Sequence, residues 1–214
     1  SYVMCVRFGP EGKWVWSSVS EGPTYVSRVD GTEKMRVMIT GSTIVDIAFD
    51  PSGGRFAAIA RDGWIYRGSA ESPETPERVI SVGTRMNLIR WLSGSDKVLV
   101  AGQEKAGGVV LDLKALKAVG EVPFTGGVNG IAVGKNGREV AIAGVDGTLR
   151  VWDIAGDHWT RVVENAHAGS VLSVGYGPDG KAAYTTGADN RVRAWNLDRE
   201  RGTSESDTHH GAVY

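Results

Sequence analysis

A repeated unit runs through all 214 residues of this chain. Its marker is an aromatic residue or Val followed by a turn that usually carries Gly, and successive markers stand 41, 42, 42 and 43 residues apart. The five markers are Phe8, Phe49, Trp91, Val133 and Tyr176. Such even self-similarity predicts one supersecondary unit repeated five times rather than several unrelated domains.

The sequence pattern of each unit predicts four short strands. Apolar residues precede every marker at the same offsets, as Val3 and Val6 precede Phe8. In the fourth unit a second strand follows at 138–143, then a tight turn at Asp146-Gly147 and a third strand at 148–152. Fainter fourth strands are predicted around 35–39, 77–81, 118–122 and 161–164. Short strands separated by Gly, Asp and Asn are typical of an all-β protein, and no window keeps a helical period.

The last two units carry a family resemblance. The fourth unit ends in Asp146-Gly147-Thr148-Leu149-Arg150-Val151-Trp152-Asp153, and the fifth ends in Asp189-Asn190-Arg191-Val192-Arg193-Ala194-Trp195-Asn196. Both segments resemble the WD-repeat family. The resemblance implies a β-propeller of four-stranded antiparallel blades, of which five are visible in this chain.

The resemblance also implies a hydrogen-bonded tetrad within a blade. In the fifth unit the matching residues are His167, Thr185, Asp189 and Trp195. We expect these four to be structural, because such a network satisfies buried polar groups. The fourth unit keeps only two of the four matches, Asp146 and Trp152, and in the second unit Gly68 stands where the Trp would be.

Two arrangements of the five units stay open. They form either a five-bladed ring or part of a larger, seven-bladed propeller, since the architecture permits both. The predicted units are 1–40, 41–82, 83–124, 125–167 and 168–208. The tail from His209 to Tyr214 repeats the phase of the segment that begins at His167, so we expect residues 209–214 to start a sixth unit. If the five units do not close alone, an oligomer is expected.

Composition limits the possible partners and location. The chain has 24 basic and 25 acidic residues, so no strong field favours nucleic acid or an anionic membrane. It has one cysteine, Cys5, and no Asn-x-Ser/Thr acceptor. These features favour a reducing, cytoplasmic location. No long apolar run or signal segment appears in the sequence.

No constellation of catalytic residues stands out. Cys5 lies in an apolar strand, where a small buried side chain is the simpler interpretation. The adjacent His209 and His210 are a weak metal motif and fit better as the opening of a repeat. Gly107-Gly108 and Gly126-Gly127 lack the Lys-Ser/Thr and the helix of a phosphate site. We therefore predict no catalytic residues, no metal and no cofactor.

Surface loops are the remaining candidates for function. In a propeller, two loops of each blade open on one rim, where side chains are free to bind partners. The predicted partner-binding residues are Arg61, Trp64, Arg85, Gln103, Lys105 and Trp159. Trp64 beside Arg61 is a pairing enriched in interface hot spots. The alternative is that Trp64 folds over a neighbouring blade, and the same alternative applies to Trp159 on the opposite rim.

One further segment could bind a partner. Residues 68–77 are polar, acidic and carry two prolines, which predicts an exposed link between the third and fourth strands of the second unit. The link is either a docking strip or a solvated loop.

The sequence thus predicts a non-catalytic scaffold or adaptor that binds protein or peptide partners on a propeller rim. Two alternatives stay open. One is a regulatory or sensor propeller that belongs to a larger signalling protein. The other is an enzyme with an active site on the propeller axis.

Overall fold

A computed structural model describes residues 2–33, 35–83, 86–102, 107–124, 126–135 and 137–197, and the backbone of 206–210. The chain divides into two compact units, residues 1–121 and 122–214. The first unit holds three sheets and the second holds two. In the described ranges, no helix is long and apolar enough to cross a membrane.

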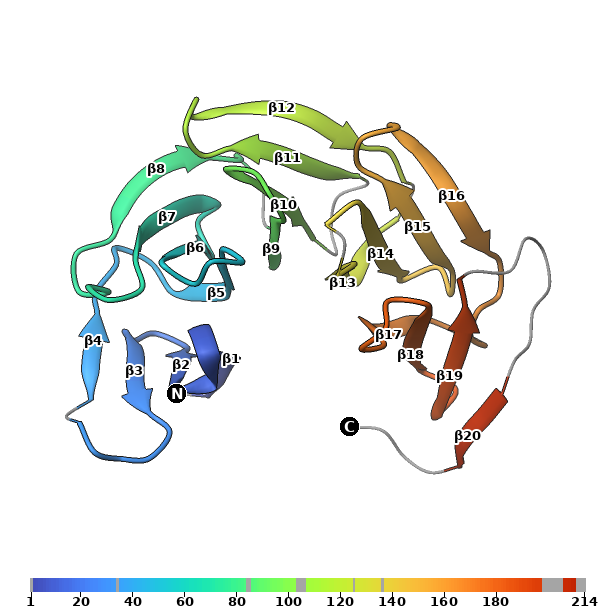
Figure 1. Ribbon diagram of the computed structural model, residues 1–214, viewed down its shortest axis with the longest axis horizontal. Coiled ribbons are helices and arrows are strands. Elements are labelled where there is room, and N and C mark those ends of the chain that lie inside the picture. Colours follow the sequence, from blue (N-terminus) through green and yellow to red (C-terminus); the bar gives the residue numbers. More distant parts are fainter. Residues whose placement is uncertain are drawn as a thin grey trace. The chain divides into compact units, whose positions relative to one another are not determined.

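Five four-stranded antiparallel sheets make up the fold, each with its strands in chain order (Figure 1). Sheet one contains β1 (Val3–Phe8), β2 (Trp14–Val19), β3 (Thr24–Arg28) and β4 (Arg36–Met38). Sheet two contains β5 (Ile44–Phe49), β6 (Arg55–Ala60), β7 (Trp64–Ser69) and β8 (Glu77–Ser81). Sheet three contains β9 (Leu88–Leu92), β10 (Lys97–Ala101), β11 (Gly108–Asp112) and β12 (Lys117–Val122).

Sheet four contains β13 (Val128–Val133), β14 (Glu139–Gly144), β15 (Leu149–Asp153) and β16 (His158–Val163). Sheet five contains β17 (Val171–Tyr176), β18 (Ala182–Gly187), β19 (Arg191–Asn196) and β20 (Ser206–His210). The described helical structure is one short 3₁₀ turn, Pro10–Gly12. The predicted all-β class, with five four-stranded sheets that follow the sequence period, is confirmed.

The tight turns between second and third strands need residues that tolerate a left-handed backbone. Gly63 and Gly147 have φ of 81° and 83°, and Asn190 has φ of 61° at the matching place in sheet five. Gly adopts this region without steric cost, and Asn tolerates it better than most residues do. The Asp-Gly and Asp-Asn pairs in the sequence therefore mark these turns.

Apolar cores lie between neighbouring sheets within each unit. The indole of Trp16 packs from sheet one onto Phe49 and Phe56 of sheet two, with ring centroids 5.1 and 4.9 Å apart. A second core joins sheets two and three, and a third joins sheets four and five. Because sheet two buries one face against sheet one and the other against sheet three, β5 and β6 are largely apolar on both faces.

A buried carboxylate ties together all three sheets of the first unit. Asp46 on β5 is 1% exposed, and its oxygens lie 2.6 Å from guanidinium nitrogens of Arg7 on β1 and Arg90 on β9. The backbone amides of Ile47 and Ile89 also donate to it, at 2.9 and 3.1 Å. Four donors thus replace the water that the carboxylate loses on burial.

The backbone of residues 206–210 forms β20, which pairs with β19 so that Arg191 lies opposite His210. Residues 209 and 210, which the sequence assigned to the start of a sixth unit, belong to this last strand of sheet five. Residues 211–214 lie outside the described residues.

Candidate functional site

The predicted rim residues are only partly described. Arg85, Gln103 and Lys105 lie outside the described residues. Arg61 is exposed in the turn after β6, and one of its guanidinium nitrogens lies 3.5 Å from the sulfur of Met4 in sheet one. No other rim candidate is brought next to it in the described part of the chain except Trp64, three residues away.

Trp64 begins β7 and is half-buried. Its ring packs against the core between sheets one and two, and the guanidinium of Arg78 on β8 lies 3.9 Å from the ring centroid. Arg78 is held in turn by Asp62, at 3.4 Å. This indole is therefore engaged by its own sheet and by the core, as the packing alternative expects.

Trp159 lies on β16 and is also half-buried. Its ring meets Trp152 edge to face, with centroids 4.6 Å apart and planes at 74°. The two residues are direct cross-strand partners. Aromatic pairs of this kind stabilise a sheet.

The structure brings the four predicted tetrad residues together in sheet five. His167 Nδ1 lies 2.8 Å from Asp189 Oδ1, and His167 Nε2 lies 2.8 Å from Thr185 Oγ1. The indole N–H of Trp195 donates to the same hydroxyl, also at 2.8 Å. The indole N–H of Trp195 therefore donates to Thr185, whose O–H can donate to Nε2, while Nδ1 lies between Asp189 Oδ1 and Arg193 Nη1, the latter at 2.7 Å.

Asp189 ends this hydrogen-bond network and is held there by charged and polar donors. Burial disfavours the charged carboxylate, but hydrogen bonds from Arg193, His167 and the Ala168 amide outweigh burial and hold the pKa of Asp189 well below its usual range. Arg193 Nη1 lies 2.6 Å from Asp189 Oδ2. Both His167 and Thr185 are buried, so the network satisfies polar groups inside the sheet instead of presenting them to a ligand.

Other reactive side chains are isolated. Cys5 is buried with its sulfur 3.2 Å from Ser18 Oγ, and burial raises the pKa of its thiol. His158 is exposed at the start of β16. Among the described residues, no group of three or more His, Cys, Asp or Glu side chains could hold a metal ion.

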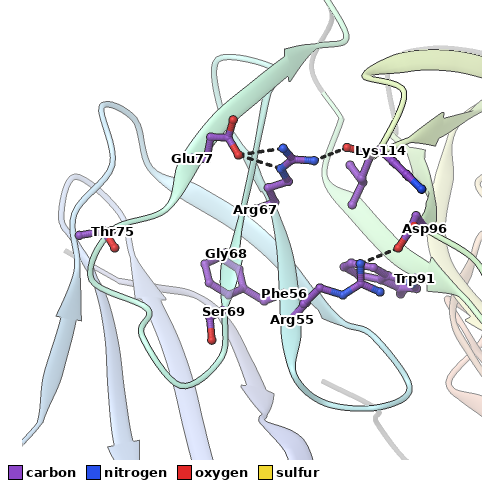
Figure 2. Close-up of a pocket in the computed structure, with 11 residues that line it drawn as sticks. Arg55, Phe56, Arg67, Gly68, Ser69, Thr75, Glu77, Trp91, Asp96 and Lys114 are labelled. Carbon is purple, nitrogen blue, oxygen red and sulfur yellow. Dashed lines mark hydrogen bonds and ion pairs between the residues drawn. The ribbon is translucent and has the colours of Figure 1, made fainter.

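A pocket of about 700 Å³ lies between sheets two and three of the first unit (Figure 2). Apolar side chains line its floor, and both basic and acidic side chains line its rim. The lining residues are Arg55, Phe56, Arg67, Gly68, Ser69, Thr75, Glu77, Trp91, Asp96, Leu113 and Lys114. A volume of this size falls within the range of roughly 300–1,000 Å³ that ligand pockets occupy.

The pocket lies at a cross-strand pair of sheet two in which the large residue and the small residue have changed places relative to sheets four and five. In sheets four and five, Trp152 and Trp195 on the third strand stand opposite Val140 and Ala183 on the second. In sheet two, Gly68 stands opposite Phe56. A Cβ at Gly68 would lie 2.7 Å from the Phe56 ring, so the ring occupies the space above Gly68. Both Phe56 and Gly68 line the pocket beside this cross-strand pair.

Ion pairs order the charged rim of the pocket. Arg55 lies 2.5 Å from Asp96 and 2.9 Å from Asp50, and its guanidinium stacks over Trp91 with 5.1 Å to the centroid. Arg67 lies 2.9 Å from Glu77 and also donates to the carbonyl of Leu113 on the neighbouring sheet. Figure 2 marks the contacts of Arg55 with Asp96 and of Arg67 with Glu77.

The link 68–77 forms one wall of the pocket through Gly68, Ser69, Thr75 and Glu77. Arg36 on β4 holds the link, because its guanidinium lies 2.5 Å from Glu74 and donates to the carbonyl of Glu71 at 2.7 Å. The sequence singled out this link but missed the residues on sheet three that face it. The only sign of these residues in the sequence was Gly68, which stands where the fourth and fifth repeats have Trp.

Thr185→Val tests the network in sheet five. Removing the bridging hydroxyl leaves the His167 and Trp195 nitrogens buried without a partner, so the free energy of unfolding should fall by about 1–3 kcal/mol. Urea unfolding followed by circular dichroism measures it. Thr186→Val, on the opposite face of the same strand, is the control, and an equal loss in both variants would contradict the network.

Exchanging two residues in sheet two tests the origin of the pocket. Gly68→Trp alone should destabilise the fold by about 1–3 kcal/mol, because the new side chain overlaps the Phe56 ring. Phe56→Val alone should cost a similar amount through the cavity that it leaves. The double variant reproduces the Val140 and Trp152 pair of sheet four, so it should recover at least about 1 kcal/mol of the summed loss.

A double-mutant cycle in urea gives the coupling between positions 56 and 68. Additive losses would show that the Phe56 ring does not occupy the place of the missing indole.

The family model described as WD domain, G-beta repeat matches the chain over residues 118–153 and 160–196. No curated protein matches the chain. The first match runs from β12 to the end of β15, and the second from within β16 to the end of β19. Each match thus covers the fourth strand of one sheet and the first three strands of the next. With five sheets of the same four-stranded form, these matches show that the chain is similar to WD-repeat proteins.

Proposed function

We propose that this protein is a non-catalytic interaction scaffold that binds a peptide segment of a partner protein in the pocket between sheets two and three. The observation that carries the proposal is the pocket itself, with its apolar floor and ordered charged rim. WD-repeat proteins typically serve as interaction scaffolds, and the similarity to them supports the same class of function.

The floor suits a large apolar side chain. Phe56, Trp91 and Leu113 line it, and all three are buried in the two cores that hold sheets two and three. The floor is therefore rigid before a ligand arrives. A preformed apolar pocket binds without the cost of ordering side chains, which favours affinity.

The rim suits a polar backbone with a carboxylate nearby. Lys114 follows the third strand of sheet three, and its side chain is exposed at the pocket. The guanidinium groups of Arg55 and Arg67 are held in place by Asp96 and Glu77. Fixed donors of this kind orient a peptide, while the apolar floor supplies most of the binding energy.

Peptide display on the folded chain tests this proposal. Peptides selected from a random library should carry a large apolar residue with an acidic neighbour. Ser69→Arg places a long charged side chain at the pocket wall, so the selected peptides should bind it at least tenfold more weakly, as measured by fluorescence polarisation. Ser72→Arg is the matched control, since Ser72 is exposed on the same link and does not line the pocket.

Two outcomes of that experiment are informative. Weaker binding to Ser69→Arg with unchanged binding to Ser72→Arg supports the pocket as the partner site. Equal affinity for both variants contradicts it. A cytoplasmic location and the lack of a nucleic-acid partner stay predictions from the composition of the chain.

A further inference from the structure

The link 68–77 carries two hydroxyl residues that are each followed by Pro. Ser72 precedes Pro73, and Thr75 precedes Pro76. Both hydroxyl residues are exposed, and neither hydroxyl makes a hydrogen bond within the described part of the chain. A Ser or Thr before Pro is the acceptor that proline-directed kinases phosphorylate, so the link presents two candidate acceptors.

The first candidate, Ser72, is held by its surroundings. Arg36 binds the residues on either side of it, through the carbonyl of Glu71 and the carboxylate of Glu74. Pro73 is also buried. A kinase could reach the proline after Ser72 only by pulling the link away from its sheet, so Ser72 is a poor acceptor in the folded chain.

The second candidate, Thr75, follows this anchored stretch and is open to a kinase. Pro76 is only partly buried, and a residue before Pro is restricted to extended backbone, which is the form that kinase active sites bind. Arg78 stands three residues after Thr75, and its side chain is 49% exposed. Cyclin-dependent kinases read Pro at the first position after the acceptor and a basic residue at the third. The segment from Thr75 to Arg78 meets both requirements, whereas Thr75 itself stands at the third position after Ser72.

Thr75 also lines the pocket between sheets two and three (Figure 2). Three basic and two acidic side chains line that pocket, so its described lining carries one net positive charge. They are Arg55, Arg67, Lys114, Glu77 and Asp96. A phosphate on Thr adds roughly 1.5 to 2 negative charges at pH 7. Phosphorylation of Thr75 therefore reverses the sign of the charge at the pocket.

We propose that Thr75 is the phosphorylation site of a proline-directed kinase and that its phosphate weakens the binding of acidic peptides in the pocket. The kinase transfers the γ-phosphoryl group of ATP to Thr75 Oγ1. The bond from the γ-phosphorus to the oxygen that bridges to the β-phosphate breaks, a bond to Oγ1 forms, the hydroxyl proton passes to the base of the kinase, and ADP leaves. The effect on peptides rests on the proposed function, since it needs a peptide that binds the pocket.

Incubation of the folded full chain with a cyclin-dependent kinase and ATP tests the site. Fragmentation mass spectrometry should place a phosphate on Thr75, at a rate at least tenfold above that on Ser72. Thr75→Ala should lose this phosphate and Ser72→Ala should keep it, and circular dichroism should show that both variants are folded. A chain that takes up no phosphate, or that takes it up on Ser72 as fast as on Thr75, overturns the proposal.

Fluorescence polarisation with the selected peptides tests the effect on the pocket. The phosphorylated chain should bind acidic peptides at least tenfold more weakly than the unmodified chain, because like charges repel. Thr75→Ala after the same kinase treatment is the control and should bind as the unmodified chain does. Unchanged affinity after phosphorylation overturns the effect on peptides. If no peptide is selected at all, the proposed function fails, while the mass spectrum still decides whether Thr75 is the phosphorylation site.

Discussion

The buried carboxylate of Asp46 is the interaction on which the first unit depends. Burying a charge costs several kcal/mol unless donors surround it, and a carboxylate left alone in this core would prevent the sheets from meeting. Arg7 and Arg90 reach it from the first strands of the two neighbouring sheets, and two backbone amides complete its shell. The position of sheet two against its neighbours is therefore fixed by directional bonds as well as by apolar packing.

Within that arrangement, the sizes of cross-strand residues on the second and third strands determine whether a sheet is filled or lies beside a pocket. Where a Trp on the third strand meets a small residue on the second, as Trp195 meets Ala183, the sheet is filled. Where Gly68 meets Phe56, the same backbone leaves a pocket whose walls are still held by ion pairs. The Gly at position 68 thus lies beside a pocket, while the ion pairs around that pocket stay in place.

The sequence predicted the features that recur in every repeat. It missed the features that depend on contacts between neighbouring sheets. Even spacing predicted all five sheets, and the resemblance to WD repeats implied the network around His167, because both are set within one repeat. The pocket depends on which residues of sheet three face Gly68, and Asp46 depends on Arg7 and Arg90, which lie 39 residues before it and 44 after it in the chain. The Arg78 guanidinium over Trp64 and the Trp152 ring against Trp159 were likewise hidden, since contacts between neighbouring strands follow from the register.

Urea unfolding of Asp46→Ala tests the account most directly. Removing the carboxylate leaves two guanidinium groups and two amides without their acceptor, so the free energy of unfolding should fall by about 3 kcal/mol or more. Asp30→Ala is the matched control, because Asp30 is an exposed partner of Arg28 and its removal should change little. A loss for Asp46→Ala no larger than that for Asp30→Ala would contradict the claim that this carboxylate holds the three sheets together.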